Sequence, residues 1–480
     1  MKTILATLAV MLSFAGQAHA AEPPAVKPDP ACICAAALDG AIQGIETDYA
    51  GYQIKIDARR RESYDSFKAI LKADAAGAGP DRCKELLDTF VAFFQDDHVF
   101  VLRGSQAGGP AGTATRSWSE KDARAEIDRN RERLDPIEGL WYSKDGRYAV
   151  LHEPGSAPGM FAGVRLGAGG APSRELGAAF RRSGHGRYQV SFRDAEGRWQ
   201  NGMAALHRGG SLLVFGITGW GRLDPLDPKD KPARLDPADP EAPLFARLDE
   251  KTLYLSLPSF MPDYQPKLEA ILAAQGAEIE KARGLIIDLR GNGGGNAIYY
   301  GLAPYLLPAG PVEVWEDNAI LASPRNLRQI EHTRAPLGDK GKIFDPAIQR
   351  MRENPGKIVP YLDSFSEEAP PPAPGPRRVV ILTDKGVGSA AEALLLLVRK
   401  SPRVILVGEN TRGNIDYEQA SWGPVGCGDH TYLLGVPLYN RTRRLPEGGL
   451  DVIGITPDVP LPDHLADPLA FAVRLLAAGS

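Results

Sequence analysis

The sequence predicts a multidomain α+β protein built from an N-terminal helical domain, a small all-β barrel or sandwich domain, and a C-terminal α/β domain. Apolar residues recur at three- and four-residue steps between positions 31 and 100, a spacing that is typical of packed helices. Short β-branched and aromatic runs separated by glycine-containing turns fill 137–219. Beyond position 245, strand patterns alternate with helix patterns, which favours a layered α/β domain.

The composition limits the kinds of partner that we expect. The chain has 480 residues, of which 43% are hydrophobic, so it can bury several cores. The net charge of -4 gives no reason to expect nucleic acid or an anionic membrane surface as a partner. After the N-terminal segment the sequence has no run of about 18 apolar residues, so we expect no stable membrane insertion.

The first residues have the pattern of a secretory signal. Lys2 supplies a positive start, the stretch from Ile4 to Phe14 is apolar, and Ala18-His19-Ala20 forms a cleavage site of small residues. We therefore expect cleavage after Ala20 and a periplasmic or secreted mature protein.

The other boundaries follow from changes in sequence texture. We expect a signal peptide at 1–20, a helical domain at 21–104, a linker at 105–136, an all-β domain at 137–220, an Asp/Pro-rich linker at 221–244, and the α/β domain at 245–480 with an insertion at about 316–376. The first linker is predicted as a loose connection with one charged helix from Glu120 to Arg133. The insertion ends in a proline-rich stretch and is predicted as a flexible wall or lid.

Four cysteines, Cys32, Cys34, Cys83 and Cys427, suit an oxidising compartment. The economical pairing joins Cys32 or Cys34 to Cys83, and the sequence does not choose among the three complete pairings. A zinc site fits less well, because the Cys-x-Cys at 32–34 has no second close pair of ligands, and we predict no metal.

The stretch 379–396 carries the first chemical motif. The apolar run from Val379 to Leu382 predicts a buried strand, Gly386 and Gly388 predict a sharp turn, and a strong helix former follows Ser389. A serine placed there has its hydroxyl at the carboxyl edge of a sheet beside the N–H groups of a helix start, which suits an acyl-transfer nucleophile. The alternative is an ordinary N-cap serine.

A second strand and glycine turn span 285–296, with the sequence Leu-Ile-Ile-Asp-Leu-Arg-Gly-Asn-Gly-Gly-Gly-Asn. Glycines at such a turn permit positive φ and close backbone approach. A phosphate loop is the alternative, but no Lys-Ser/Thr follows the glycines and the Gly-x-Gly-x-x-Gly spacing is missing.

Both motifs together make the chain similar to the S41 family of serine peptidases, which includes the C-terminal processing proteases and the tricorn-like enzymes. The resemblance rests on 253–260, 288–295, 388–392, 408–413 and 454–459, which occur in the family's order and cover about the last half of the chain. It implies a crotonase- or ClpP-like α/β core and a peptidase that acts on polypeptides or peptides without a cofactor.

The catalytic base requires a separate argument. Processing proteases of this family place a lysine where this chain has Asn414, and asparagine cannot accept the serine proton. The tricorn-like branch uses a histidine instead, and Asp96-Asp97-His98-Val99 resembles its Asp-x-His stretch. The resemblance thus implies that His98 is the base for Ser389. His430 is the fallback base.

An acid should orient the imidazole. Relatives place a carboxylate three residues before their Gly-x-x-Pro-Asp motif, which corresponds here to Asp451, with Glu447 and Asp416 as fallback candidates. The oxyanion site should combine the N–H of Ala390 with one from the glycine turn, that of Gly294 or an immediate neighbour.

The all-β domain departs from the family. It lacks the carboxylate-binding loop of the PDZ domains that read substrate C-termini, and its histidines, His152, His185 and His207, have no ligand-like spacing and are interpreted as structural or solvated. We therefore expect an exported serine peptidase with a Ser-His-acid mechanism. The alternatives are an inactive peptide-binding or scaffolding protein that keeps the fold, and an esterase that uses the same serine.

Overall fold

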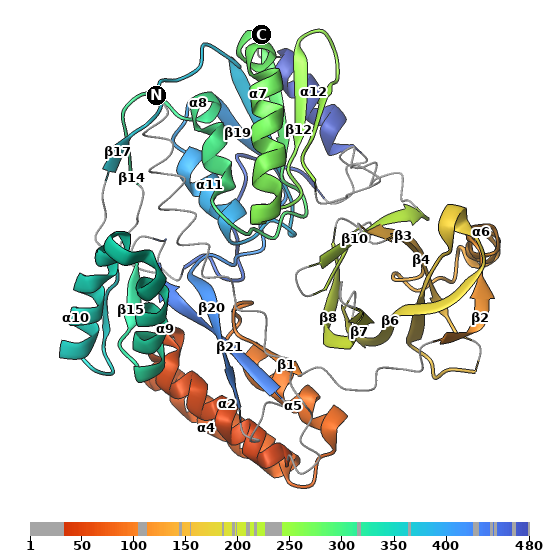
Figure 1. Cartoon of the computed structure of the whole chain (residues 1–480), viewed down its shortest axis with the longest axis vertical. Helices are drawn as coiled ribbons and strands as arrows, with labels where there is room; N and C mark the ends of the chain where they lie inside the picture. Colours follow the sequence, from red (N-terminus) through yellow and green to blue (C-terminus); the bar gives the residue numbers. More distant parts are fainter. Residues whose placement is uncertain are drawn as a thin grey trace.

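The computed structural model places three lobes around the middle of the molecule (Figure 1). It describes residues 33–103, 113–143, 146–153, 155–184, 187–193, 197, 199–207, 212–215, 218–225, 242–313, 318–362, 366–425, 432–441, 445, 449–462 and 467–478. The expected signal segment, Cys32 and Cys427 lie outside these ranges. Within these ranges no helix is both long and apolar enough to span a lipid bilayer.

The first lobe is a layered α/β unit with one mainly parallel sheet. Its strands, in spatial order, are β11 (Leu244–Arg247), β12 (Thr252–Ser256), β13 (Gly284–Asp288), β18 (Arg378–Thr383), β19 (Val404–Gly408) and β22 (Val459–Pro460). Only β11 runs antiparallel to its neighbour. Strands β12, β13, β18 and β19 were predicted for the α/β domain, because each is a continuous apolar run bounded by turn residues. The fifth predicted strand, 432–438, belongs instead to the sheet of the second lobe, and β11 and β22 were not predicted.

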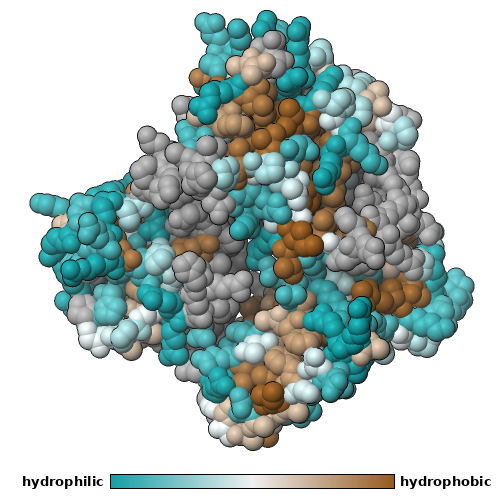
Figure 2. Space-filling model, turned by 180° about the vertical axis from the view of Figure 1, so that it is seen from behind, coloured by the Kyte–Doolittle hydropathy of each residue, from teal (hydrophilic) through white to brown (hydrophobic). Residues whose placement is uncertain are grey.

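Alternate residues of these strands pack against helices on opposite faces of the sheet. Ile287 and Ile381 point into one core, which includes residues of α7 (Gln265–Lys281), η5 (Ile298–Leu302), α8 (Ala303–Leu306) and α11 (Ala390–Val398). Ile286 and Val380 point the other way, toward α12 (Pro468–Ala478). Seen from behind, the broadest hydrophobic area of the surface lies on this lobe (Figure 2).

The second lobe is built on an antiparallel sheet whose strands come from the N-terminal region, the insertion and the C-terminal part of the chain. Its strands are β1 (Phe100–Arg103), β21 (Tyr432–Asn440), β15 (Ala319–Leu321) and β16 (Ile358–Pro360), with β20 (Tyr417–Pro424) also paired to β21. The N-terminal helices α2 (Cys34–Asp48), α3 (Ala50–Lys55), α4 (Ala58–Ala75) and α5 (Pro80–Ala92) share one core with β20 and β21. The helical region therefore shares its core with strands of the C-terminal half. Strand β1, which follows α5, pairs with β21.

The disulfide of this lobe joins Cys34 to Cys83, one of the two pairings left open by the sequence, and connects α2 to α5. The insertion adds α9 (Pro324–Arg334), η6 (Ala335–Phe344) and α10 (Asp345–Glu353), which pack with β15 and β16 around a core of their own. A two-stranded ribbon of β14 (Pro311–Glu313) and β17 (Ser366–Glu368) flanks them. The described part of the insertion is thus packed structure rather than a flexible lid.

The third lobe is a closed antiparallel barrel, seen at the right of Figure 1. Its strands are β3 (Gly139–Ser143), β4 (Gly146–His152), β5 (Met160–Arg165), β6 (Ser173–Gly184), β7 (Arg187–Arg193), β8 (Trp199–His207), β9 (Leu212–Phe215) and β10 (Thr218–Asp224). Each strand pairs with the next and β10 pairs with β3, which closes the sheet. The structure therefore has the barrel and not the sandwich, within the multidomain α+β fold that the sequence predicted.

Part of the segment that was predicted as a loose linker packs on the outside of this barrel. Strand β2 (Thr113–Trp118) pairs with β6, and α6 (Glu120–Asn130) buries Ala123 and Ile127 against the outer face of β3, β4 and β5. The helix was expected from its charge pattern. Its packing on the barrel was not expected, because only two of its eleven residues are buried.

Candidate active site

The two glycine turns predicted from the sequence lie against each other. They follow β13 and β18, which are adjacent and parallel, so their carboxyl ends meet at the same edge of the sheet. Asp384 Oδ1 accepts the N–H of Gly291 at 2.8 Å and that of Gly386 at 2.9 Å. A Cβ added at Gly386 would lie 2.6 Å from the Cα of Gly291, so the turns touch backbone to backbone. The two motifs form one site.

Ser389 has a backbone conformation that ordinary N-cap residues do not adopt. Its φ and ψ are 51° and -122°. The N-cap serines of α6 and α9, Ser119 and Ser323, have φ of -94° and -89°, and each accepts a hydrogen bond from the N–H three residues ahead. A non-glycine residue at positive φ costs about 1–3 kcal/mol and is found where the surroundings enforce it. Ser389 therefore forms a capping box with Glu392 but does not have the backbone conformation of a conventional helix cap.

Glu392 holds this strained turn in place. Its fully buried carboxylate accepts the N–H groups of Ser389 at 3.0 Å, Gly413 at 2.9 Å and Asn414 at 2.8 Å, and the hydroxyl of Thr411 at 2.5 Å. Burial raises the pKa of Glu392, although these donors act in the opposite direction. Glu392 lies within the 388–392 motif, but no role was predicted for it. Its signal was an acidic residue at the third position of an otherwise apolar helix.

A potential oxyanion site lies beside Ser389. Among the described residues, the N–H of Ala390 has no hydrogen-bond partner. Gly294 approaches it so closely that an added Cβ would lie 2.8 Å from Ser389 Cβ and 2.9 Å from Ala390 N. The N–H of Gly294 itself, however, donates to Asn292 Oδ1 at 2.8 Å. Gly294 therefore provides space rather than the predicted donor. In the described parts of the chain, the free N–H groups of this turn belong to its neighbours at 293 and 295.

The turn that carries His98 lies against the Ser389 turn. The carboxylate of Asp97 forms an ion pair with Arg412. The backbone N–H of Arg412 donates to Val387 O at 2.8 Å. Cδ of the Arg412 side chain lies 3.4 Å from the position that a Cβ at Gly388 would take. The structure thus brings the His98 and Ser389 segments together through one side chain. No hydrogen bond joins the two side chains themselves in the described residues.

The carboxylate beside His98 is Asp96. Asp96 Oδ1 lies 3.8 Å from His98 Nδ1 and accepts the backbone N–H of His98 at 2.9 Å. Asp96 Oδ2 accepts the hydroxyl of Tyr49 at 2.7 Å. Burial raises the pKa of Asp96. His98 Nδ1 is buried and has no hydrogen-bond partner among the described residues, so Asp96 is the nearest available one.

Asp451 does not pair with His98, in contrast to the prediction. Its carboxylate is held by Lys55 Nζ at 2.9 Å, and Lys55 also donates to Phe94 O at 2.9 Å. Burial, and next the negative charge of Asp96, raise the pKa of Asp451 to about 7. Sequence reasoning missed Lys55, which lies at the end of an N-terminal helix almost four hundred residues away and looks like a solvated charge.

The fallback candidates have other places. The carboxylate of Asp416 accepts the N–H groups of Leu450 and Asp451, the latter at 2.9 Å, and so braces that loop. Glu447 and His430 lie outside the described residues. Asn414 stands beside the serine turn with its side-chain oxygen buried and, within the described ranges, unpartnered.

No described group of three or more His, Cys, Asp or Glu side chains is arranged to hold a metal ion. The chemistry offered by this site is that of a serine hydroxyl, an imidazole with a carboxylate, and unpaired backbone N–H groups. This combination suits acyl transfer.

The contact at Gly294 can be tested by stability. Gly294→Ala should lower the free energy of unfolding by about 1–3 kcal/mol, because alanine disfavours the φ of 101° and its methyl would collide with Ser389 and Ala390. Gly293→Ala is the matched control, since a Cβ there meets nothing within 4 Å. Denaturant unfolding of both variants measures the difference, and equal losses would contradict the argument.

The pairing of Asp451 predicts a pH dependence. Because its pKa is raised to about 7, the folded state holds a proton that the unfolded state has lost above about pH 4. Its contribution to stability is therefore present at low pH and lost as pH rises to about 7. The free energy of unfolding of wild type minus that of Asp451→Asn should fall with pH, by at most about 1.4 kcal/mol per unit. A pH-independent difference would show that this carboxyl is not perturbed.

Comparison with known proteins places the site in a family. The model of peptidase family S41 matches residues 251–461, which include both glycine turns and Ser389. No curated protein matches the chain.

Distant similarities to solved structures accompany this match. Mature CPAF is 14% identical with a TM-score of 0.46, over 90% of this chain and 93% of its own. The photosystem II D1 C-terminal processing protease is 13% identical with a TM-score of 0.35, over 90% and 95%. The tricorn protease is 12% identical with a TM-score of 0.39, over 93% and 37%. The family assignment rests on the matched segment. Residues 251–461 of this chain match peptidase family S41.

Proposed function

We propose that the chain is a serine peptidase in which Ser389 is the nucleophile and His98 the general base. The observation that carries this proposal is the strained backbone of Ser389 beside the N–H of Ala390, which has no partner in the described part of the chain. Strain of this kind is retained where it places a side chain for a function. The match of residues 251–461 to family S41 supports peptide-bond hydrolysis as that function.

In the proposed reaction, Ser389 Oγ adds to the peptide carbonyl carbon while its proton passes to His98 Nε2. The carbonyl oxygen becomes an oxyanion, which accepts hydrogen bonds from Ala390 N–H and from the N–H of residue 293 or 295. His98 then gives the proton to the leaving amine as the C–N bond breaks. Water attacks the acyl-enzyme by the same route and releases the acid.

We assign Asp96 as the positioning residue for His98. Its Oδ1 lies next to His98 Nδ1 and accepts the backbone N–H of His98, and its Oδ2 accepts the hydroxyl of Tyr49. The 3.8 Å separation is longer than a hydrogen bond, and catalytic hydrogen bonds often shorten only when substrate is bound. Lys55 is not available as a base, because Asp451 and Phe94 O hold its ammonium group.

Labelling by a fluorophosphonate probe tests the mechanism. Wild type should be modified at Ser389, and His98→Gln should label at least about 100-fold more slowly, because general-base catalysis contributes about that much. Ser389→Ala should not label. Ser323→Ala is the matched control: it removes an ordinary N-cap serine and should label like wild type, with folding of each variant checked by circular dichroism.

The same assay separates the two acids. Asp96→Asn should slow labelling more than Asp451→Asn and should lower the midpoint of the pH profile, because a negative charge beside the imidazole is lost. A purely structural role of Asp96 would leave that midpoint unchanged. If wild type is not labelled and cleaves neither peptides nor esters, the chain is an inactive member that binds peptides. Cleavage of esters alone would identify an esterase.

We also propose that the chain is exported. The predicted signal at 1–20 supports this, and so does the disulfide between Cys34 and Cys83, since disulfides persist in oxidising compartments. On expression of the full chain in a bacterial host, the intact mass should correspond to a product starting at Ala21. Leu8→Arg places a charge in the apolar stretch and should keep residues 1–20 attached. A wild-type product that retains Met1 would contradict export.

A further inference from the structure

The proposed base reaches Ser389 from a different part of the fold. His98 lies between α5 and β1, whereas Ser389 follows β18 of the α/β lobe. Among the described residues, none of that lobe forms a hydrogen bond with the imidazole of His98. A displacement of about 1 Å between reacting groups can cost about a hundredfold in rate. Contacts elsewhere in the His98 turn therefore have to set the distance between the two side chains.

Arg412 makes such a contact one residue before the base. Its guanidinium pairs with the carboxylate of Asp97, which lies 315 positions earlier in the chain. The aliphatic part of the same side chain covers Gly388 in the serine turn. Its Cβ and Cδ lie 3.7 Å and 3.4 Å from the position that a Cβ at Gly388 would take. One side chain thus packs on the residue before the nucleophile and binds the residue before the base.

The loop that carries Arg412 is itself fixed to the serine turn. Asn414 O accepts the N–H of Ser389 at 3.1 Å. The carboxylate of Glu392, on the helix that Ser389 begins, accepts the N–H groups of Gly413 and Asn414 at 2.9 Å and 2.8 Å. Arg412 and the nucleophile therefore move as one unit, and the pair with Asp97 joins the base to that unit.

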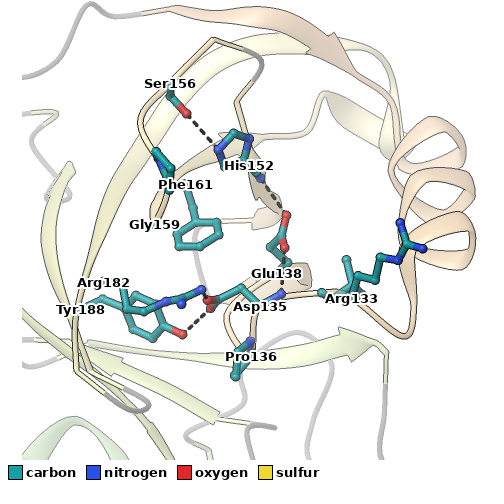
Figure 3. Close-up of a pocket in the computed structure, with 12 residues that line it drawn as sticks. Arg133, Asp135, Pro136, Glu138, His152, Ser156, Gly159, Phe161, Arg182 and Tyr188 are labelled. Atoms are coloured by element: carbon teal, nitrogen blue, oxygen red, sulfur yellow. Dashed lines mark hydrogen bonds and ion pairs between the residues drawn. The ribbon is translucent and has the colours of Figure 1, made fainter.

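Ion pairs in the barrel have a different effect, because they stay within one lobe. At a cavity of about 500 Å³, Asp135 pairs with Arg182 and accepts the hydroxyl of Tyr188 (Figure 3). All three residues belong to the barrel or to the segment that leads into it. Such a pair fixes neighbouring parts of one lobe, whereas the pair of Arg412 with Asp97 joins the two halves of the proposed catalytic site.

A second ion pair, between Lys55 and Asp451, connects the same two regions but is more buried. Its two side chains are 16% and 7% exposed, and Lys55 Nζ lies 2.9 Å from Asp451 Oδ2. The side chains of Arg412 and Asp97 are 34% and 47% exposed. Because salt screens exposed pairs more than buried ones, ionic strength should weaken the Arg412 pair and leave the Lys55 pair in place.

We propose that Arg412 and Asp97 form a positioning pair for His98, and that salt lowers catalytic activity by screening this pair. The inference rests on the proposed function, because the pair acts by placing the general base. While the pair is formed, the turn of Asp97 holds the imidazole within reach of Ser389. When the pair is screened or removed, the base is in place for a smaller fraction of the time. An exposed ion pair can shift such a balance by up to about fivefold.

The rate of labelling of Ser389 by a neutral fluorophosphonate tests the inference. Arg412→Gln and Asp97→Asn should each slow labelling about two- to fivefold. The double variant should be no slower than either single variant, because both remove one contact. Arg412→Lys keeps the charge and should label faster than Arg412→Gln. Arg334→Gln is the matched control, since Arg334 and Asp345 form a pair with nearly the same exposure, 35% and 47%, and its rate should equal that of wild type.

Two further comparisons separate positioning from a purely structural role. In His98→Gln, adding Arg412→Gln should not slow labelling further, because the pair acts through the imidazole. Between about 0.05 M and about 1 M NaCl, wild type should slow about two- to fivefold while Arg412→Gln keeps a constant rate. Additional slowing in the His98→Gln background, or salt dependence that persists without Arg412, would overturn the inference. Circular dichroism checks that each variant is folded.

Hydrogen–deuterium exchange tests the contact without catalysis. In Ser389→Ala, the amides of His98 and Val99 donate to Asp96 within the turn, and adding Arg412→Gln should speed their exchange about two- to fivefold. Exchange that ignores the substitution would show that the pair does not hold the turn. The outcomes also separate the two proposals: a wild type that is not labelled refutes the nucleophile, whereas a labelled wild type whose rate ignores both Arg412→Gln and salt refutes the positioning pair alone.

Discussion

The buried carboxylate of Glu392 is the interaction on which the Ser389 site depends. It gathers donors from the serine turn and from the 411–414 loop, so the strained φ of Ser389 is enforced from two directions. Each bond to a buried ionised acceptor is stronger than a neutral one, and together they can offset the cost of a non-glycine residue at positive φ. The carbonyl of Asn414 accepts the same Ser389 N–H at 3.1 Å and supports the turn as well.

The same loop links the α/β lobe to the N-terminal helices. Arg412 contacts both the serine turn and Asp97, and the segment that contains Asp97 is delivered by α5 and β1. Because β1 pairs with β21, which comes more than three hundred residues later, the helices and the C-terminal strands have to fold together. The proposed base therefore comes from outside the segment that matches the peptidase family.

What could be predicted from sequence was local. The strands, turns and helices around 284–296 and 378–398 follow from apolar runs and glycines, and both were recognised. Three features were not recognised: the pairing of Lys55 with Asp451, the role of Glu392, and the packing of α6 on the barrel. The first two join groups that are distant in sequence, and the third depends on only two buried residues. The acid named for His98 came from a family motif, whereas the structure offers one two residues away in the chain.

Two acids, Asp96 and Asp451, and one lysine, Lys55, form a cluster of charges, in which Asp96 lies next to His98. Burial, and next the charge of Asp96, raise the pKa of Asp451, and of these two carboxylates Lys55 binds that of Asp451. Asp96, which Lys55 does not contact, is the carboxylate that lies next to the imidazole. A buried negative charge there stabilises an imidazolium more than the neutral ring. The cluster is thus suited to hold the proton that His98 would take from Ser389, and Lys55 limits how strongly it is held.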